Sequence, residues 1–268
     1  SYYTRHDLVA QLIRTALLPV MEERLKGKRS KEEQEAALLG ITVLDPACGS
    51  GHFLLAAARK LSEKLAQVRT GSENPGKRDL IEARRDVISR CIHGVDKNPA
   101  AIELCRLALW LEAHTVGKPL TFLEHRIRPG DALVGVDDLD CLKKGIPEGA
   151  FNPVSGDDKK TASIFKKRNK QFLATRQLGL FAGELHLEED MGRFAEGYRA
   201  VDALRTEDLS SQAEQGKRYA AYKSNRGWWK DKVACDLYVY AFFQPYQEGM
   251  KESDIVDSQL LLKQLTSA

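Results

Sequence analysis

The sequence predicts an α/β fold in which helices flank a mainly parallel, doubly wound sheet. Between residues 41 and 128, short apolar runs rich in β-branched residues alternate with longer segments of helical periodicity. An acidic residue and a glycine or proline follow each apolar run. Alternating strands and helices form βαβ units with right-handed crossovers, so the carboxyl ends of the strands share one edge of the sheet. Ligands of doubly wound folds bind at that edge.

The composition is that of a globular protein, with 43% apolar and 29% charged residues among 268. The longest apolar run, Leu237 to Phe243, is far shorter than the roughly 20 residues of a membrane-spanning helix. We therefore expect a cytoplasmic protein that does not contact a membrane. A net charge of +3 does not by itself indicate nucleic acid binding. Widely spaced cysteines without a CxxC pair predict reduced thiols and no metal site (Cys48, Cys91, Cys105, Cys141, Cys235).

The first elements follow from capping residues and apolar spacing. Residues 4–26 are predicted to form a helix with Thr4 as N-cap and a kink at Pro19. Residues 27–35 are interpreted as a charged surface connection. The run 41–44 is predicted to be a buried strand that ends at Asp45, and residues 52–68 a helix that packs on the sheet.

The pattern then repeats. Residues 79–90 are predicted to form a charged helix and residues 91–95 a strand that ends at Asp96. Asn98 is expected to cap a helix that reaches about residue 114, with Pro99 in its first turn. On its surface, Glu103 and Arg106 have the spacing of an ion pair. A third strand is expected near residues 125–128.

The turn after the first strand carries the strongest signal for a ligand. Residues 43–54 read VLDPACGSGHFL, so glycines stand between a buried strand and a helix. Glycines allow a ligand to approach the backbone, and the first turn of a helix offers free N–H groups. The G-x-G-x-x-G spacing of dinucleotide folds and the lysine of a phosphate-binding loop are both missing from this segment.

This segment resembles motif I of the amino-methyltransferases, D-P-A-C-G-S-G-x-F/H-L. Three more segments occur in the order of that family: Tyr2-Tyr3-Thr4, residues 94–99 (GVDKNP) and residues 130–133 (GDAL). Together, residues 1–135 resemble adenine-N6 DNA methyltransferases, especially the large methylases of restriction and phage-defence systems. The resemblance implies a Rossmann-like class I fold that binds S-adenosylmethionine. It also implies about seven strands, so we expect this chain to hold an incomplete sheet.

The resemblance implies a role for each motif. Asp45 and the glycine turn would surround the methionine part of the cofactor, Asp96 would accept both ribose hydroxyls, and Asp131 would accept from the adenine amino group. The implied cofactor-binding residues are Tyr2, Tyr3, Thr4, Asp45, Pro46, Ala47, Cys48, Gly49, Ser50, Gly51, His52, Phe53, Asp96, Lys97, Asn98, Gly130, Asp131, Ala132 and Leu133. Taken alone, Asp45 could equally cap a turn. Cys48, Cys105, His52 and Trp110 are interpreted as packing residues rather than chemical groups.

The sequence lacks the turn that the family uses for catalysis, an Asn/Asp-Pro-Pro-aromatic motif that binds a flipped adenine. Asn152-Pro153-Val154 is its nearest match, without the second proline, the aromatic residue or a preceding apolar strand. We therefore expect the catalytic residues beyond residue 268 and expect this chain alone to be inactive.

Beyond the motifs the composition changes. We predict three parts: residues 1–141 as the cofactor-binding half with its N-terminal helix, 142–226 as a charged helical insertion, and 227–268 as a return towards the core fold. A basic run at 159–176 could contact DNA phosphates through Lys166, Lys167, Arg168 and Lys170, or form a solvated helix face. Trp228 and Trp229 could stack on a base, but core or interface burial is preferred.

These observations favour the S-adenosylmethionine-binding part of an adenine-N6 DNA methyltransferase from a restriction-modification or phage-defence system. The expected partners are double-stranded DNA, reached through a longer protein, and other restriction or defence subunits. A methyltransferase acting on RNA or protein glutamine is one alternative. A non-catalytic subunit that binds S-adenosylmethionine is another, and a nucleotide-binding dehydrogenase is disfavoured by the glycine spacing.

Overall fold

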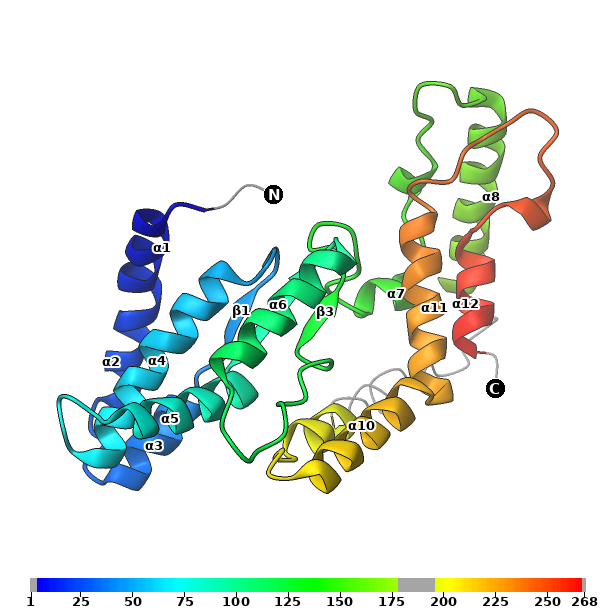
Figure 1. Cartoon of the computed structure of the whole chain (residues 1–268). Coiled ribbons are helices and arrows are strands. Elements are labelled where there is room, and N and C mark those ends of the chain that lie inside the picture. Colours follow the sequence, from blue (N-terminus) through cyan, green and yellow to red (C-terminus); the bar gives the residue numbers. More distant parts are fainter. Residues whose placement is uncertain (1–3, 178–195, 267–268) are drawn as a thin grey trace. The chain divides into compact units, whose positions relative to one another are not determined.

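The chain folds into two compact units in the computed structural model, which describes residues 4–177 and 196–266 (Figure 1). The first unit comprises Ser1–Ala132 and Arg199–Tyr219, and the second comprises Leu133–Tyr198 and Ala220–Ala268. This grouping differs from the predicted division at residues 142 and 227. Residues 199–219, expected within the insertion, belong to the first unit.

The first unit is built on a parallel three-stranded sheet. Strands β1 (Val43–Asp45), β2 (Ile92–Asp96) and β3 (Ile127–Pro129) lie side by side in the order β1-β2-β3. Asp45 pairs in register with Gly94, and Asp96 with Pro129, so the strands end at one edge. The predicted α/β class and parallel sheet are confirmed, with strand bounds shifted by one or two residues.

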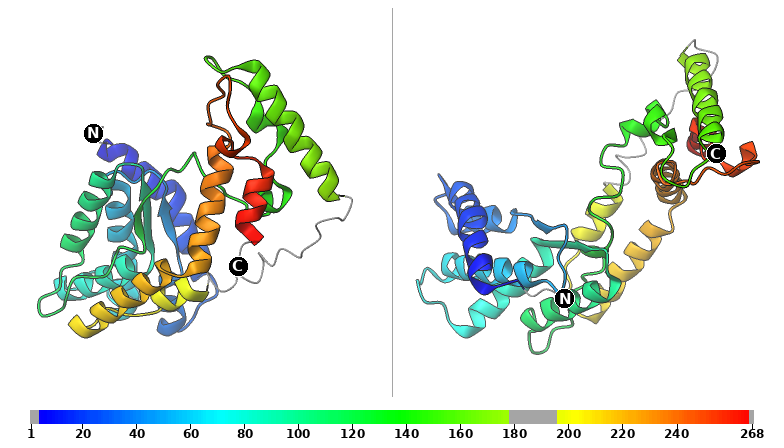
Figure 2. Two further views of the ribbon diagram at one scale, coloured as in Figure 1. Left: turned by 90° about the vertical axis from the view of Figure 1, so that its right-hand side faces the viewer. Right: turned by 90° about the horizontal axis from the view of Figure 1, so that it is seen from above.

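Helices pack against this sheet and bury its core (Figure 2). Both α4 (His52–Thr70) and α6 (Pro99–Glu112) contact the strands, and Ile92 and Ile127 are fully buried. Leu44, one position along β1 from Val43, is 60% exposed. The largest fully buried side chains of the first unit are Leu38, Leu54, Leu61, Leu65, Ile88, Ile92, Ile102, Leu109, Leu123 and Ile127.

The N-terminal helix is interrupted where the sequence predicts one kink. It consists of α1 (His6–Leu12), a π-helical turn (Ile13–Leu17) and α2 (Leu18–Leu25). The π turn ends two residues before Pro19, which has no N–H to donate to the preceding turn. The Leu18 N–H donates to the carbonyl of Ile13, five residues back, as in a π-helix. The prediction that Thr4 caps the helix is wrong. Arg5 is the N-cap, and it makes no side-chain cap bond.

A helix replaces part of the predicted surface connection. Residues Lys31–Leu39 form α3, so the interpretation of 27–35 as a connection is wrong from Lys31 onwards. The cause is a capping box: Ser30 Oγ accepts from the Glu33 N–H at 3.1 Å, and the Ser30 N–H donates to Glu33 Oε2 at 3.2 Å. The Ser-x-x-Glu spacing of Ser30 and Glu33 predicts the start of this helix.

The next βαβ unit follows its prediction closely. Helix α5 (Lys77–Arg90) leads into β2, and Asn98 caps α6 by accepting from the Ala100 N–H at 3.0 Å. Arg106 and Glu103 form the expected ion pair at 2.7 Å. The predicted cap and pair are therefore confirmed.

Residues 199–219 are held in the first unit by polar contacts, the Arg85–Thr206 bond being a buried one. Arg85 Nη2 donates to the Thr206 carbonyl at 2.7 Å, and Thr206 Oγ1 donates to Gln215 Oε1 at 2.9 Å. Gln212, in α10 (Leu209–Lys223), donates to the Leu120 carbonyl. These contacts join residues up to 121 positions apart, which local patterns cannot predict.

Among its described residues, the second unit is helical. It contains α7 (Asp140–Lys144), a 3-10 turn (Glu148–Phe151), α8 (Lys159–Gln177), α11 (Arg226–Tyr240), a second 3-10 turn (Glu252–Asp254) and α12 (Ser258–Thr266). The core gathers around Phe151 and Tyr246, and buried Asn169 links the Ile146 carbonyl to the Ser258 N–H. None of the helices formed by residues 4–177 and 196–266 has the length and apolarity to span a bilayer.

Candidate cofactor site at the carboxyl edge of the sheet

The predicted cofactor residues lie where the strands end. Asp45 and Asp96 are the last residues of β1 and β2, and Asp131 follows β3 by two residues. Because the strands are parallel and in register, the turns that carry these three carboxylates belong to one edge, called here the carboxyl edge. Thr4 precedes α1, whereas Tyr2 and Tyr3 lie outside the described residues.

Asp96 holds this edge together. Its Oδ2 accepts from the Gly49 N–H at 2.8 Å, and its Oδ1 accepts from the Asn98 N–H at 2.8 Å. The Gly130 N–H donates to the Asp96 carbonyl at 2.9 Å. One residue thus links the glycine turn after β1, the start of α6 and the turn after β3. Each carboxylate oxygen still has acceptor capacity for a ligand hydroxyl.

The glycine turn has a conformation that requires glycine at two positions. Gly49 has φ of 53° and Gly51 has φ of 88°, both in the left-handed region. A Cβ added to Gly49 would meet nothing within 4 Å, so this position faces open space. A Cβ added to Gly51 would lie 2.6 Å from Cys105 Sγ. Gly49 therefore leaves room for a ligand, while Gly51 allows the turn to pack on α6.

Behind the turn, Cys48 and Cys105 form a buried thiol pair. A hydrogen bond between the two thiols lowers the pKa of Cys48 and, with burial, raises the pKa of Cys105. A Cβ on Gly94 would also meet Cys48 Sγ, at 3.0 Å. The two side chains fill the space between the turn and α6, in agreement with their interpretation as packed thiols.

Asp45 caps its own turn with one oxygen and lines a hollow beside it. Its Oδ1 accepts from the Ala47 N–H at 3.0 Å, so this oxygen caps the turn, which was the alternative role considered for Asp45. An apolar hollow of about 460 Å³ is lined by Asp45, Pro46, Phe53 and Leu44, together with residues of α1 and α2. This hollow brings part of the predicted site together with the N-terminal helix.

On the β2–β3 side, Lys97 and Asp131 form an ion pair. Lys97 Nζ lies 2.9 Å from Asp131 Oδ2, and the lysine side chain is 83% exposed. Asn98 Oδ1 is engaged as the cap of α6, whereas Ala132 and Leu133 are exposed. An exposed pair of this kind exchanges easily, so Asp131 can accept from a ligand when Lys97 moves aside.

His52 opens α4 beside this turn. Its ring meets that of His6 edge-on, with centroids 5.0 Å apart, and burial lowers the pKa of His52. Its neighbour Ser50 is exposed in the glycine turn. The contact with His6 ties the turn to α1, as expected of a packing residue.

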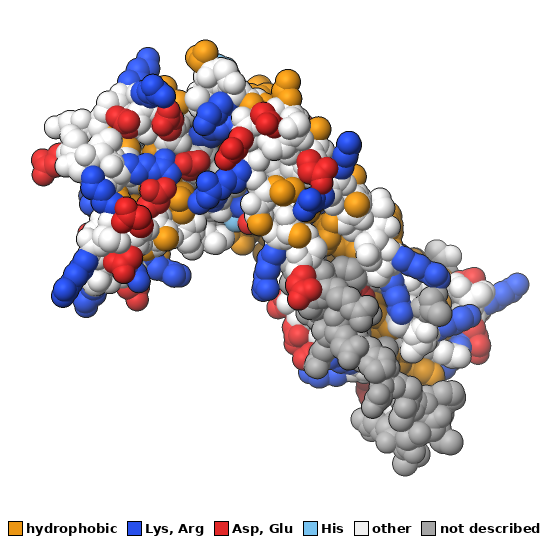
Figure 3. All heavy atoms as spheres, turned by 90° about the horizontal axis from the view of Figure 1, so that it is seen from below, with side chains coloured by type: hydrophobic (Ala, Val, Ile, Leu, Met, Phe, Trp, Pro, Cys, Tyr) orange, Lys and Arg blue, Asp and Glu red, His pale blue; other side chains and the backbone are white. Residues whose placement is uncertain are grey.

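The predicted DNA contacts on α8 are largely engaged within the second unit. Lys166 Nζ donates to Asn152 Oδ1 at 3.1 Å, Lys170 pairs with Glu148 at 3.1 Å, and Arg168 pairs with Glu252 at 2.8 Å. Lys167 is exposed. On the face drawn in Figure 3, basic and acidic side chains are interspersed.

Asn152, the weak catalytic candidate, follows the 3-10 turn Glu148–Phe151. The polar residue of the family's catalytic turn follows a strand, so Asn152 lacks that setting. Among the described residues, no strand precedes it in the second unit. Its amide oxygen accepts from Lys166, which gives it a structural role.

A parallel α/β sheet with a glycine turn and acidic residues at its carboxyl edge is the architecture typical of domains that bind a nucleotide or a nucleoside-containing cofactor. Residues 21–129 match the family model described as the MmeI DNA-methyltransferase domain. This match covers β1, β2 and β3, and therefore the sheet and the glycine turn.

Two curated relatives agree with the family model. The chain is 33% identical over 118 residues to the adenine-specific methyltransferase PglX of Streptomyces coelicolor, covering 44% of this chain and 9% of the relative. It is 26% identical over 172 residues to a putative type II restriction enzyme and methyltransferase of Methanocaldococcus jannaschii, covering 50% of this chain and 14% of the relative. No solved structure matches. The resemblance to adenine methylases of restriction and phage-defence systems is therefore confirmed, although the chain spans a small part of these relatives.

Proposed function

We propose that this chain is the S-adenosylmethionine-binding part of an adenine-N6 DNA methyltransferase of a restriction or phage-defence system. The observation that carries the proposal is Asp96, whose carboxylate joins the glycine turn to the start of α6 within the matched region. The three-stranded parallel sheet is compatible with a Rossmann-like class I fold, and we propose that fold for this chain.

The chemistry of the edge suits the donor. S-adenosylmethionine supplies an electrophilic methyl group on a sulfonium and also carries an amino group, a ribose and an adenine. Asp45 would attract the amino cation, since a carboxylate forms charge-assisted hydrogen bonds with an ammonium group. The open side of Gly49 leaves room for the backbone to approach the methionine part. Asp96 would accept hydrogen bonds from the ribose hydroxyls. Asp131 would accept them from the adenine amino group once Lys97 has moved aside.

The remaining predicted residues would complete the cleft around these contacts. Pro46, Ala47, Cys48, Ser50, His52 and Phe53 would shape the methionine end, Lys97 or Asn98 would lie against the adenine, and Gly130, Ala132 and Leu133 would back it. Thr4, with Tyr2 and Tyr3, would close the methionine end. The hollow beside Asp45, Pro46 and Phe53 supports this arrangement.

The adenine-N6 methyltransferases that this chain resembles use a catalytic turn that this sequence does not contain. No Asn/Asp-Pro-Pro-aromatic turn occurs in the 268 residues. We therefore propose that the chain binds the donor and that transfer to a flipped adenine in double-stranded DNA takes place in a longer assembly. The same absence favours a second candidate, a non-catalytic subunit that binds S-adenosylmethionine. Transfer to RNA or protein glutamine stays an alternative for the acceptor.

Calorimetric titration with S-adenosylmethionine, and separately with NAD, tests the cofactor assignment. We expect saturable binding of S-adenosylmethionine alone, strongly weakened in Asp96→Asn and retained in the control Glu23→Gln, an exposed carboxylate on α2. Binding of NAD, or equal binding by Asp96→Asn and wild type, would contradict the proposal.

Transfer itself is tested by incubating the chain with tritiated S-adenosylmethionine and duplex DNA, RNA or protein. We expect donor binding without label transfer to any of them. Label on adenine of DNA would show that the chain is active alone, and label on RNA or protein would replace DNA as the acceptor.

A further inference from the structure

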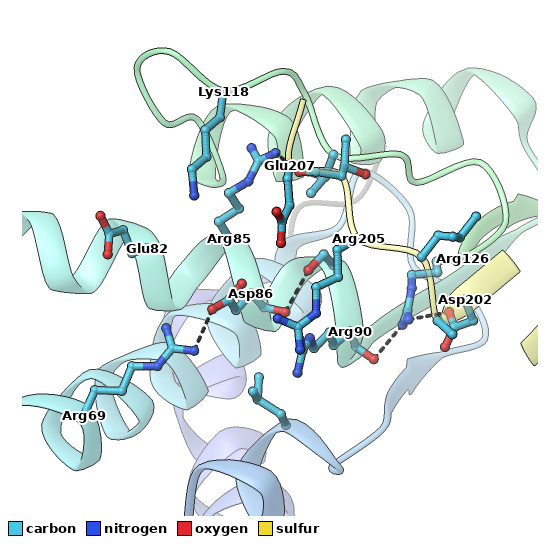
Figure 4. A pocket seen from close by; sticks show the side chains of 16 residues that line it. Arg69, Glu82, Arg85, Asp86, Arg90, Lys118, Arg126, Asp202, Arg205 and Glu207 are labelled. Atoms are coloured by element: carbon cyan, nitrogen blue, oxygen red, sulfur yellow. Dashed lines mark hydrogen bonds and ion pairs between the residues drawn. The ribbon is translucent and has the colours of Figure 1, made fainter. Parts of the chain in front are cut away.

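The opposite edge of the same sheet holds a second cavity. Leu39 before β1, Arg90 before β2 and Arg126 before β3 line it, so it lies where the strands begin, called here the amino edge (Figure 4). The cavity has a volume of about 430 Å³ and is closed on one side by residues 202–207. None of the predicted cofactor residues lines it. It is therefore separate from the carboxyl edge.

The cavity is rich in cations, only some of which have carboxylate partners. Six basic side chains line it: Arg69, Arg85, Arg90, Lys118, Arg126 and Arg205. Arg69 pairs with Glu35 and Asp86, both at 2.6 Å, and Arg126 pairs with Asp202. Within the described part of the chain, the other four form no ion pair with a carboxylate. Glu82, which pairs with Arg78, and Glu207 are the remaining acidic residues of the lining.

Arg85 is the central residue of this cavity. It is 6% exposed, and its Nη2 donates to the Thr206 carbonyl at 2.7 Å. Burial lowers the pKa of Arg85, because a desolvated guanidinium loses its hydration. A guanidinium has five N–H donors, and a buried charge is stable when it is paired and hydrogen-bonded. The Thr206 carbonyl accepts from Nη2 alone, so most of the N–H donors of Arg85 are available to a ligand.

A polar side chain next to it points to the same conclusion. Thr121 lines the cavity and is 2% exposed, and its hydroxyl has no hydrogen-bond partner among the described residues. The Thr121 backbone is fixed, since its carbonyl accepts from Trp110 Nε1 at 2.6 Å. A buried hydroxyl without a partner is uncommon and is satisfied when a ligand oxygen reaches it.

Helix dipoles account for only part of this charge. Arg69 and Arg90 lie in the last turns of α4 and α5, where a cation offsets the partial negative charge of the helix end. Arg85 is in the interior of α5, while Lys118 and Arg205 lie in loops. These three cations line the cavity, and an interaction with the end of a helix does not explain their positions.

We propose that the amino edge of the first unit is an anion site for a small phosphate-bearing ligand, bound by Arg85, Arg90, Lys118 and Arg205, with Thr121 completing the contacts. Arginine forks match phosphate oxygens, and a cavity of this volume is within the range of small-ligand pockets. A recessed cavity favours a small ester over duplex DNA, whose phosphates contact exposed basic surfaces.

The test is calorimetric titration of the chain with inorganic phosphate and with pyrophosphate at constant ionic strength. We expect saturable binding, tighter for pyrophosphate, and unchanged when S-adenosylmethionine is saturating. Lys118→Gln/Arg205→Gln changes two exposed residues and should weaken pyrophosphate binding by about tenfold or more. Arg85→Gln should abolish it. Lys77→Gln, an exposed lysine of α5 outside the cavity, is the matched control and should bind as wild type.

Four results would overturn the proposal. The first is a lack of saturable binding of either ion. The second is equal affinity in Lys118→Gln/Arg205→Gln and Lys77→Gln, and the third is displacement of pyrophosphate by S-adenosylmethionine. The final probe is a 12-base-pair DNA duplex. The proposal would also be overturned if the duplex bound through these residues and pyrophosphate did not bind. Because the double variant changes only exposed side chains, a folding defect in Arg85→Gln leaves the test intact.

Discussion

The two edges of one sheet are built in different ways. At the carboxyl edge, short turns carry glycines and carboxylates, and the Gly49 N–H donates to Asp96 over 47 residues. At the amino edge, Arg85 reaches Thr206 over 121 residues, and Arg126 pairs with Asp202. The first edge is assembled from local motifs, and the second from segments distant in sequence. This difference determines both what a sequence can predict and which variants damage the fold.

The largest effect is expected for Asp96→Asn. An amide cannot accept from both the Gly49 and Asn98 N–H groups as a carboxylate does, and it presents an N–H₂ group to one of them. S-adenosylmethionine affinity should fall by roughly 100-fold, since charge-assisted hydrogen bonds are lost. Calorimetry on Asp96→Asn and on the control Glu23→Gln measures this. Affinity within twofold of wild type would show that Asp96 does not contact the ligand.

A pair of glycine variants separates folding from binding at the carboxyl edge. Gly51→Ala has both a positive φ and a clash with Cys105 Sγ, so it should lower the free energy of unfolding by about 2–4 kcal/mol. Gly49→Ala has the positive φ but open space, and should cost about 1–2 kcal/mol while blocking the cofactor. Urea unfolding and calorimetry on both variants check this.

The double variant Gly51→Ala/Cys105→Ala serves as the control for the clash. It should recover part of the stability that Gly51→Ala loses, because the Sγ atom is removed. If the double variant is less stable than Gly51→Ala, the contact with Cys105 is not the cause.

The amino edge should contribute to the molecule's sensitivity to mild acid. Burial, followed by the charge of Arg126, lowers the pKa of His93, and Arg126 Nη1 lies 3.1 Å from its Nε2. Burial also lowers the pKa of His125. The unfolded chain therefore binds more protons as pH falls through the ordinary histidine pKa of about 6.5, and stability decreases there. It levels off below the lowered pKa values.

The matching measurement is the midpoint of thermal unfolding between pH 7.5 and 5. His93→Gln, which keeps an acceptor for Arg126, should flatten this dependence, and His114→Gln, at an exposed position, should not. Asp202 acts in a separate window: burial raises its pKa, but hydrogen bonding from His125 and the charge of Arg126 outweigh burial and lower it. Its contribution is therefore lost as pH falls from the ordinary aspartate pKa of about 3.9 towards the lowered value. An unchanged slope in His93→Gln would contradict this account.

The smallest effect is expected for Lys97→Gln. The Lys97–Asp131 pair is exposed on the lysine side, so its loss should change the free energy of unfolding by less than about 0.5 kcal/mol. Removing the lysine uncovers Asp131, and S-adenosylmethionine affinity should stay the same or rise slightly. Chemical unfolding and calorimetry on the same sample measure both. A tenfold loss of affinity would mean that Lys97, rather than Asn98, lies against the adenine.

The same contrast explains what the sequence could predict. The strands, α4, the cap at Asn98 and the acidic residues at the strand ends follow from local patterns, and each is present in the structure. Helix α3 was also predictable, because Ser30 and Glu33 have the capping-box spacing. The Thr4 cap was not formed, because the helix begins at His6 and Arg5 takes the N-cap position.

The amino edge could not be predicted in this way. Arg85 and Arg126 are indistinguishable in sequence from surface arginines, and both are buried through contacts with residues 202–206. Likewise, Asp96 was expected to contact a ligand, but its bond to the Gly49 N–H depends on the register of β1 and β2. Side-chain partners distant in sequence appear only when the fold is known.

Hydrogen–deuterium exchange with and without S-adenosylmethionine tests the central claim most directly. The account predicts protection of peptides that contain the glycine turn at 45–53 and the start of α6 at 96–100, without change in peptides 85–90 and 118–126. Protection confined to the amino edge, or no protection at either edge under conditions where the ligand binds, would contradict the assignment of the cofactor to the carboxyl edge.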